Sequence, residues 1–311
     1  MRIWQAIAAL ILLCTPIQSG WAQPASFPNA PEIVAPPTHQ NGVEPLSPNE
    51  THPNAKRLAS QAALALTTYS AGETTQQIAA RLEFAGAAAS ELAAIFHVPG
   101  AWSRGRIIYP QLGGLGADAA SVMVVVEQMV GTAEGIQVFI RTLDIRLVLS
   151  GTSWRFAELA SIGGTLVTEP AAPSPQALAV LNDPRIEMPD SARWDILSGS
   201  ISPDLLAIMA RLADRTPFGV VTLSQGHPYE VFGTNRQSDH TRGRAFDIYR
   251  LGDTLVIDGR AQGSMIHQTV QWLYQQPEIR QIGSPWALDG VGGRSFTDRL
   301  HQDHLHIAVS R

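Results

Sequence analysis

Cysteine is almost absent from this sequence of 311 residues. The only one, Cys14, lies in an apolar stretch close to the amino terminus. If that stretch is removed, the mature chain has no thiol, which excludes disulfide bonds and a cysteine nucleophile. A stable fold must then rest on an apolar core, which 45% hydrophobic residues can supply.

Basic residues are also few, and they are dispersed. The chain holds 22 Lys and Arg against 27 Asp and Glu, a formal net charge of -5, and its pI is near 6.0. Nucleic-acid-binding domains concentrate positive charge in a patch that follows the phosphates. Because no basic run of this kind is present, we expect no nucleic-acid partner.

No apolar run has the length of a membrane span. The stretch Ala6–Ile17 has about ten to twelve strongly apolar residues, whereas a spanning helix needs roughly twenty. Arg2 precedes it, and Gly20-Trp21-Ala22 follows with a small-x-small cleavage pattern. We predict a signal peptide over residues 1–22, a periplasmic or secreted protein, and no transmembrane segment after cleavage.

Two proline-rich segments divide the rest of the chain. Residues 23–55 hold eight prolines and few large apolar side chains, which predicts a linker without a core. Residues 169–202 begin with three prolines and are expected to form a second linker and an irregular arm.

Residues 56–168 are expected to form an α+β domain. Apolar residues recur at helical spacing between Lys56 and Ala94, which predicts two or three helices. From Ala120 the period changes to that of strands. Three apolar runs separated by glycine turns make up this pattern: Val122–Val126, Ile136–Val148 and Trp154–Leu159. Helices packed on an antiparallel meander fit these patterns, and no motif assigns chemistry to this domain.

Residues 203–311 are expected to fold as a second, separate domain. The pattern predicts helices near 203–213 and 264–275, and strands near 220–223, 245–250, 254–257, 280–282 and 303–309. Helices flanking a small antiparallel sheet fit this order. The fold class predicted for the whole chain is α+β.

Three residues of the last domain have the chemistry of a catalytic zinc site. Such a site takes three protein ligands from His nitrogen and carboxylate oxygen and keeps its fourth position for water. His240, Asp247 and His306 meet this requirement. Gly243 allows a tight turn between His240, in a loop, and Asp247, in a predicted strand.

Histidines also cluster at the end of the chain, at positions 301, 304 and 306. If residues 303–309 are extended, His304 and His306 face the same way, because side chains alternate along a strand. Burying several imidazoles without partners would cost about 1–3 kcal/mol for each unsatisfied group. The clustering therefore favours a metal site or a solvent-filled cleft.

The spacing of these residues resembles that of a known family. Ser-x-His-x-x-Gly-x-Ala-x-Asp, from Ser238 to Asp247, is followed by His-x-Asp-His-x-His, from His301 to His306. This pair of motifs is similar to the zinc D-Ala-D-Ala metallopeptidases, relatives of lysostaphin and of the hedgehog signalling domain. The resemblance covers roughly the last third of the chain.

The resemblance implies a site as well as a fold of the hedgehog or D,D-peptidase type. It implies that Zn²⁺ binds to His240, Asp247 and His306, and that Asp303 is the general base. His304 would then stabilise the transition state, although in lysostaphin-like relatives the corresponding His is the base. The sequence leaves both divisions of labour open.

One feature of the family is missing. The D-Ala-D-Ala enzymes carry an arginine upstream of the first zinc ligand, where it holds the substrate or its developing oxyanion. The corresponding stretch, 223–228, has none, so His227 or Arg236 must substitute. This departure favours an endopeptidase over a carboxypeptidase. Ser238 and His301 are expected to orient the metal-binding and catalytic side chains.

The function predicted from the sequence is an exported zinc metallopeptidase that hydrolyses amide bonds in peptidoglycan peptides, as an endopeptidase or a D,D-carboxypeptidase. The alternative is a catalytically inactive, zinc-stabilised binding domain of the hedgehog type. The presence of both Asp303 and His304 favours the enzyme, whereas the missing arginine favours the binding domain. A third possibility is that the amino-terminal domain carries the function by binding a ligand or partner.

Overall fold

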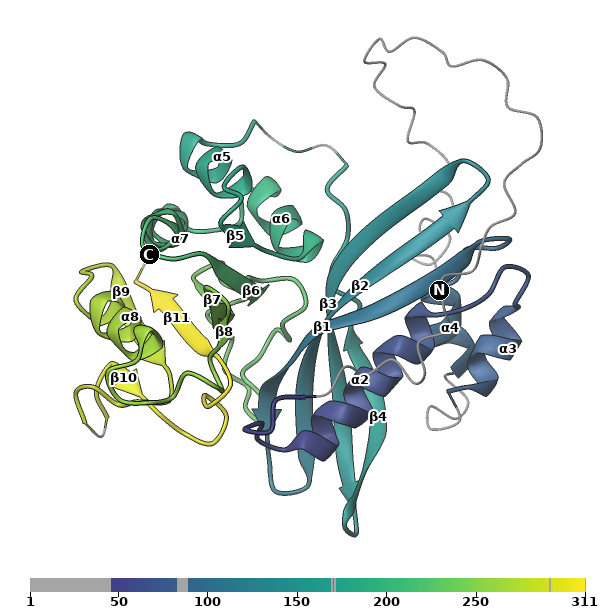
Figure 1. Ribbon diagram of the computed structural model, residues 1–311, viewed down its shortest axis with the longest axis horizontal. Coiled ribbons are helices and arrows are strands. Elements are labelled where there is room, and N and C mark those ends of the chain that lie inside the picture. Colours follow the sequence, from purple (N-terminus) through teal and green to yellow (C-terminus); the bar gives the residue numbers. More distant parts are fainter. Residues whose placement is uncertain (1–45, 83–88, 169, 171, 291, 311) are drawn as a thin grey trace. The chain divides into compact units, whose positions relative to one another are not determined.

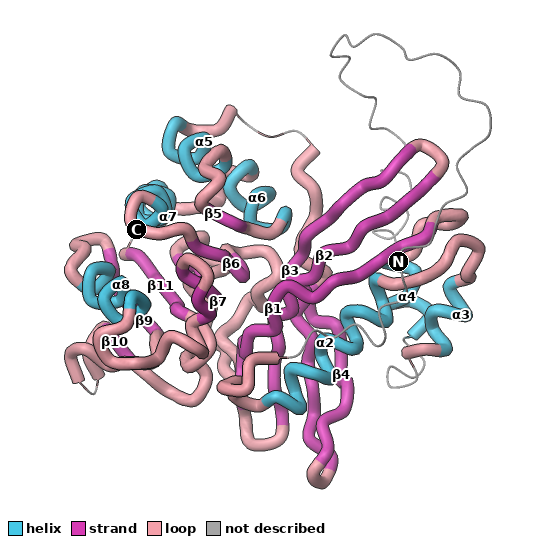
Figure 2. Tube along the Cα trace, viewed as in Figure 1, coloured by secondary structure: helices cyan, strands magenta, loops and turns pink. Residues whose placement is uncertain are grey.

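The computed structural model describes residues 46–82, 89–168, 170, 172–290 and 292–310. The expected signal peptide and most of the first expected linker lie outside these residues. The described part is α+β, with two sheets and their helices (Figures 1 and 2). None of its helices combines the length and the apolar character needed to cross a bilayer.

The first sheet is antiparallel and has the strand order β1-β2-β3-β4. Its strands are β1 (Trp102–Leu115), β2 (Ala119–Thr132), β3 (Gly135–Ser150) and β4 (Ser153–Ser161). The meander predicted from residue 120 is confirmed, but β1 was not predicted, because its apolar residues are interrupted by Arg, Gly and Pro. β2 is a continuous apolar run because both of its faces are buried.

Helices cover one face of this sheet. They are α2 (Pro53–Thr67), α3 (Thr75–Ala80) and α4 (Ala89–Phe96), in agreement with the two or three expected. The apolar stripe of α2, which includes Ala59, Ala63 and Leu66, packs on Val122, Val124 and other buried residues of the sheet. α2 runs across the sheet in Figure 1.

The second sheet is mixed, with the order β10-β9-β11-β7-β6-β5 and β8 paired to β7. Its strands are β5 (Ile186–Glu187), β6 (Phe218–Thr222), β7 (Ala245–Leu251), β8 (Thr254–Leu255), β9 (Ile279–Gly283), β10 (Ser295–Phe296) and β11 (Leu305–Val309). The prediction of a purely antiparallel sheet is wrong, because β5 pairs with β6, and β10 with β9, in parallel. The two central pairings, β6 with β7 and β7 with β11, are antiparallel as expected.

Helices α7 (Pro203–Ala213) and α8 (Met265–Tyr274) lie where the sequence predicted them. They pack with the second sheet around a core that includes Leu305, Ile307 and Val309, the alternate residues of β11 expected to face inward. His267 of α8 is buried against Trp286.

Both expected linkers contain ordered, packed structure. Residues 169–202 include α5 (Pro175–Leu181), β5 and α6 (Asp190–Leu197), whose apolar residues join the core of the second sheet. At the end of the first linker, α2 begins at Pro53, and the Glu50 side chain is 1% exposed. Prolines 53 and 175 stand in the first turns of helices, where a missing N–H is tolerated, so proline content alone misplaced these boundaries.

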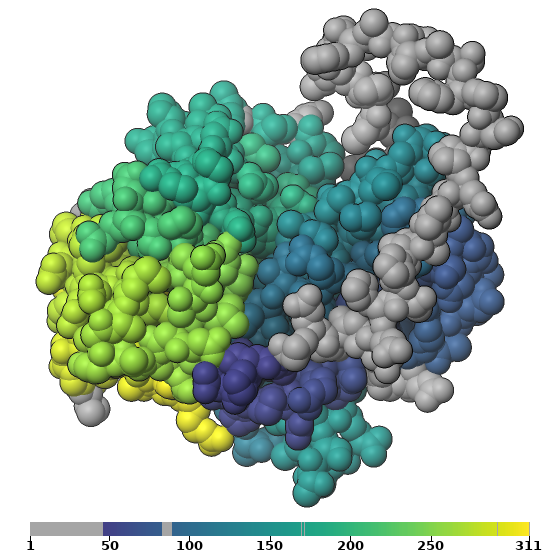
Figure 3. Space-filling view, in the orientation of Figure 1, coloured from purple at the N-terminus to yellow at the C-terminus, as the bar shows by residue number. Residues whose placement is uncertain are grey.

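The two sheets share a buried contact. The face of the first sheet that α2 does not cover packs on the second sheet through Tyr109, Met123 and Val125 against Val221 and Tyr249. The rings of Tyr109 and Tyr249 are stacked with centroids 5.0 Å apart. The described residues thus form one compact unit rather than two separate domains, as the space-filling view also shows (Figure 3). This contact brings β1 against the end of the chain that carries the histidine cluster.

Candidate metal centre

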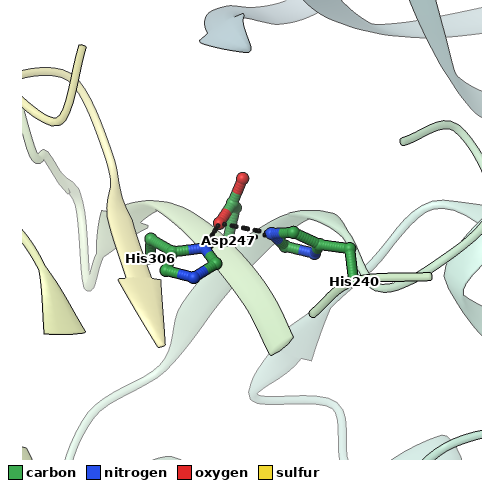
Figure 4. A group of neighbouring side chains, drawn as sticks. All are labelled: His240, Asp247 and His306. Atoms are coloured by element: carbon green, nitrogen blue, oxygen red, sulfur yellow. Dashed lines mark hydrogen bonds and ion pairs between the residues drawn. The ribbon is translucent and has the colours of Figure 1, made fainter. Parts of the chain in front are cut away.

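The three predicted zinc ligands converge on one point (Figure 4). Nε2 of His240 lies 3.2 Å from Oδ1 of Asp247 and 3.0 Å from Nδ1 of His306, and this Nδ1 lies 3.0 Å from the same Oδ1. Ligand atoms about 2.0–2.1 Å from a tetrahedral zinc are separated by about 3.3 Å. The spacing and the donor set therefore fit one zinc ion.

Strand pairing sets two of these positions. Asp247 is on β7 and His306 is on β11, and the antiparallel register places the two residues directly opposite each other. Cross-strand neighbours of this kind have adjacent side chains. The sequence predicted both strands but carries no signal for their register.

The third ligand is set by a loop. His240 precedes a turn in which the N–H of Gly243 donates to the His240 carbonyl (2.8 Å). Gly243 has a φ of +68°, and a Cβ there would lie 2.0 Å from the carbonyl oxygen of Ser200. Only glycine fits this turn, because both the backbone conformation and the available space exclude a side chain.

Hydrogen bonds orient the His240 ring for metal binding. Its Nδ1–H donates to the Leu223 carbonyl (2.7 Å), which directs Nε2 toward Asp247. Asp195, on α6, accepts from the backbone N–H groups of Ser224 (2.8 Å) and Gln225 (2.9 Å) and so fixes the loop that supplies this carbonyl.

Burial and neighbouring charges shift the pKa values of two of the candidate ligands, His306 and Asp247. Burial lowers the pKa of His306 to about 4, so its imidazole is neutral at pH 7. Burial alone would raise the pKa of Asp247, but His240 and His304 hold it well below its usual range. A neutral imidazole and an ionised carboxylate are the forms that bind zinc.

The predicted catalytic pair, Asp303 and His304, lies beside these ligands. Nδ1 of His304 is 2.6 Å from Oδ1 of Asp303, and its Nε2 is 3.9 Å from Oδ2 of Asp247. Both side chains are almost completely buried. One ring nitrogen of His304 is therefore held by Asp303 while the other faces the ligand cluster.

Asp303 is in turn held by groups from the amino-terminal half. Nζ of Lys56, on α2, lies 2.5 Å from its Oδ2, and the N–H of Leu112, on β1, donates to the same oxygen (3.0 Å). Lys56 also forms an ion pair with Glu50, which accepts from the Tyr109 hydroxyl (2.8 Å). Burial alone would raise the pKa of Asp303, but Lys56 and His304 lower it to about 2.

Lys56 is the only lysine in the sequence, and its side chain is completely buried. Charged side chains are rarely buried without a partner. A lone lysine at the start of an amphipathic helix was thus a signal of a special position. Its partners could not be read from the sequence, because Glu50 lies six residues before it and Asp303 lies more than 240 residues after it. The sequence prediction gave this half of the chain no chemistry, and the structure places three of its residues against the site.

The third contribution from this half is Gln111 of β1. Its Nε2 donates to Oδ2 of Asp247 (2.6 Å), the carboxylate oxygen that does not face His240 and His306. Such a contact fixes the orientation of a ligand. Gln111 has no distinguishing pattern around it in the sequence.

A cleft of about 690 Å³ opens over the ligand cluster. The end of β1 and its turn, residues 111–117, line it together with residues of the loops before β7 and before β11. The candidate ligands and His304 line it, as do the predicted substrate residues His227 and Arg236.

His227 stacks on the candidate ligand His240, with ring centroids 4.3 Å apart and an interplanar angle of 14°. Burial and the neighbouring His240 lower its pKa to about 3, so the ring is neutral at pH 7. Its Nδ1–H donates to the Pro228 carbonyl (2.7 Å), which leaves Nε2 as an acceptor. This tautomer cannot donate to an oxyanion, so of the two candidates Arg236, which is exposed in the cleft, has the required charge.

The two residues expected to orient the site have clear contacts. Oγ of Ser238 accepts from the backbone N–H of His240 (3.3 Å), so it fixes the loop at this ligand. The His301 ring lies 4.9 Å from that of His304, and its Nδ1 is 2.8 Å from Oδ1 of Asp298. His301 therefore packs against His304 and does not bond to Asp303.

Comparisons of the chain with protein-family models, with curated proteins and with solved structures gave no match.

Proposed function

We propose that this protein is a zinc-dependent peptidase whose ligands are His240, Asp247 and His306. The convergence of two imidazole nitrogens and one carboxylate oxygen at the floor of an open cleft is the observation that carries the proposal. Three protein ligands of this type and an accessible fourth position distinguish catalytic zinc from structural zinc, which takes four protein ligands. A zinc ion bound there supplies Lewis acidity, which polarises the scissile carbonyl and acidifies water.

His304 is the general base in this proposal. Asp303 accepts the Nδ1 proton, so Nε2 carries the free lone pair and faces the ligand cluster. Burial opposes the charged ring, but Asp247 and Asp303 outweigh this and raise the pKa of His304 above its usual value. The ring can therefore take a proton at Nε2 from the attacking water and return it to the leaving amine.

Asp303 serves as the positioning group and not as the base. Its Oδ1 is occupied by His304 and its Oδ2 by Lys56 and the Leu112 N–H. Asp303 is also 0% exposed and does not line the cleft, so it is not placed to take a proton from water there. This geometry supports the division of labour of the lysostaphin-like relatives.

The substrate we propose is a peptide cross-link of peptidoglycan, cut as an endopeptidase would cut it. Export, expected from residues 1–22, would bring the protein to this polymer. The cleft of about 690 Å³ is lined by both halves of the chain, and we propose that it holds a peptide that continues past the scissile bond, which suits an internal amide bond. Arg236, exposed in the cleft, is the proposed contact to the carbonyl oxygen or to a substrate carboxylate.

The test is hydrolysis of purified murein sacculi by the mature protein, with products identified by mass. We expect peptide fragments from the zinc-loaded wild type, none after chelation, and recovery when zinc is restored. His304→Ala should bind zinc but release no fragments, and His306→Ala should do neither.

His97→Ala is a suitable control, because His97 is bonded to the Glu73 carbonyl and packs on Tyr69, far from the cleft. It should retain both zinc and activity. If the zinc-loaded wild type releases nothing from sacculi or isolated cross-linked peptides, the peptidase proposal fails and the zinc-stabilised binding domain takes its place.

A further inference from the structure

β1 has a free edge that faces the cleft. It is the first strand of its sheet, and its second edge is bridged by Tyr69 at Ser103, near the start of the strand. From Gln111 to Leu115 this edge has no strand partner among the described residues. The end of β1 and the following turn line the cleft without a break from residue 111 to residue 117. A sheet edge exposed in this way can pair with another extended chain.

The hydrogen-bond alternation shows which backbone groups point outward. The N–H of Gly116 donates to the carbonyl of Ala119 on the β2 side (2.7 Å), so the N–H and C=O of Leu115 point to the opposite, outer edge. Further along, a bulge at Gly113 keeps Leu112 on the outer edge, where its N–H already bonds to Asp303. Leu115 thus offers one donor and one acceptor to the cleft, and no described residue takes them.

Gln111 gives an independent indication that the site is incomplete without a ligand. Its side chain is completely buried and its Nε2 is bonded to Asp247, but its Oε1 has no partner among the described residues. A buried acceptor without a donor is energetically unfavourable. Because Gln111 lines the cleft beside the metal ligands, a donor of the bound substrate would satisfy it.

The loop opposite leaves this edge open. Phe232 packs on the face of β1 at Gly114, where a Cβ would lie 2.2 Å from the phenyl ring. Any larger residue at position 114 would collide with this ring, which explains the glycine there. Phe232 therefore packs on the face of β1, and Leu115 lines the cleft.

We propose that the outer edge of β1, from Gln111 to Leu115, binds the substrate peptide as an added strand. The occupant is an extended peptide that bonds to the N–H and C=O of Leu115 and donates an N–H to Oε1 of Gln111, with its scissile amide over His240, Asp247 and His306. This inference rests on the proposed peptidase function. It makes the amino-terminal half of the chain the substrate-binding wall of the site.

Leu115→Pro tests the proposal, because proline removes the outward N–H and is tolerated on an edge strand. Leu115→Ala is the matched control, which loses the side chain but keeps the backbone donor. The probe is cross-linked muropeptide released from sacculi. One hydrogen bond is worth about 1 kcal/mol, so Leu115→Pro should raise KM about fivefold over Leu115→Ala, with kcat and zinc content unchanged. Equal KM values in the two variants overturn the proposal.

A second measurement does not depend on turnover or on the fold of the proline variant. Zinc-loaded His304→Ala is incubated with the same muropeptide, and amide hydrogen exchange is followed at Leu115. Protection of the Leu115 amide by the peptide supports the added strand. If the wild type hydrolyses nothing but this amide is protected, only the peptidase proposal fails. Hydrolysis by the wild type without protection of Leu115 overturns the edge-binding proposal and leaves the peptidase intact.

Discussion

Replacement of Lys56 by Met is the most informative change to this protein, because it touches neither the candidate ligands nor the cleft. It removes the ammonium group that bonds to Asp303 and Glu50, and it keeps a side chain of similar length for the core. Asp303 then loses one of the groups that keep its carboxylate in place for His304. We expect the variant to bind zinc and to lose turnover.

The size of the effect follows from the burial of the pair. Lys56 and Asp303 are both 0% exposed, and removing one partner of a buried ion pair costs about 3–5 kcal/mol. The pKa of Asp303 is about 2 against an ordinary 3.8, which corresponds to about 2 kcal/mol in favour of the carboxylate after the desolvation penalty. At pH 7 we therefore expect Lys56→Met to lower the free energy of unfolding by about 3–5 kcal/mol.

Turnover should fall by more than about tenfold, up to the roughly 10²- to 10⁴-fold that a positioned acid–base group contributes. KM should change little, because Lys56 does not line the cleft. Steady-state kinetics at saturating zinc and chemical denaturation measure the two effects. Arg106→Met is the control, because the pair of Arg106 with Glu127 is on the surface, with the Arg side chain 57% exposed. It should change stability by less than about 1 kcal/mol and leave turnover unchanged.

The single lysine and the single cysteine permit a rescue experiment. In a mature chain without Cys14, Lys56→Cys introduces the only thiol. Aminoethylation of the unfolded chain followed by refolding restores an ammonium group at nearly the original distance, and it should restore both stability and turnover. The double variant Lys56→Met with Glu50→Gln should regain part of the stability but none of the turnover, because Asp303 still has no cation. Full activity in Lys56→Met would refute the positioning role of Lys56.

Three further predictions concern the metal centre. Alanine in place of any one of the three candidate ligands should leave less than about one zinc per ten chains after dialysis, whereas the wild type keeps about one per chain. Elemental analysis measures the zinc content, and full occupancy in His306→Ala would contradict the ligand set. Asp195→Ala should weaken zinc binding about 10- to 100-fold, because it frees the loop whose Leu223 carbonyl orients His240. Competition with a chelator measures the affinity, and an unchanged value would show that other contacts fix this carbonyl. Gly243→Ala should lower the free energy of unfolding by at least about 1–3 kcal/mol, because the new Cβ would meet the Ser200 carbonyl. An unfolding temperature within a degree of that of the wild type would contradict the strained turn.

The sequence by itself was sufficient for the local elements and the ligand types of the second half. The amphipathic period of α7 and α8 and the alternation of β11 are local patterns, and they predicted the observed elements within a few residues. The spacing of His240, Asp247 and His306 likewise predicted a cluster that the structure brings together. The element predictions succeeded because each depends on residues close in the chain. The cluster joins residues up to 66 positions apart, and it was predicted from the chemistry and the motif spacing of its side chains.

Only the tertiary structure decided how the two halves meet. The register that sets His306 opposite Asp247, and the packing that brings Lys56, Gln111 and Leu112 to the site, join residues 59 to 247 positions apart. No local period encodes such contacts, because they follow from the burial of one sheet face against another. The candidate ligands were therefore predictable from the sequence, whereas the groups that hold Asp303, and the free edge of β1 that faces the cleft, were not.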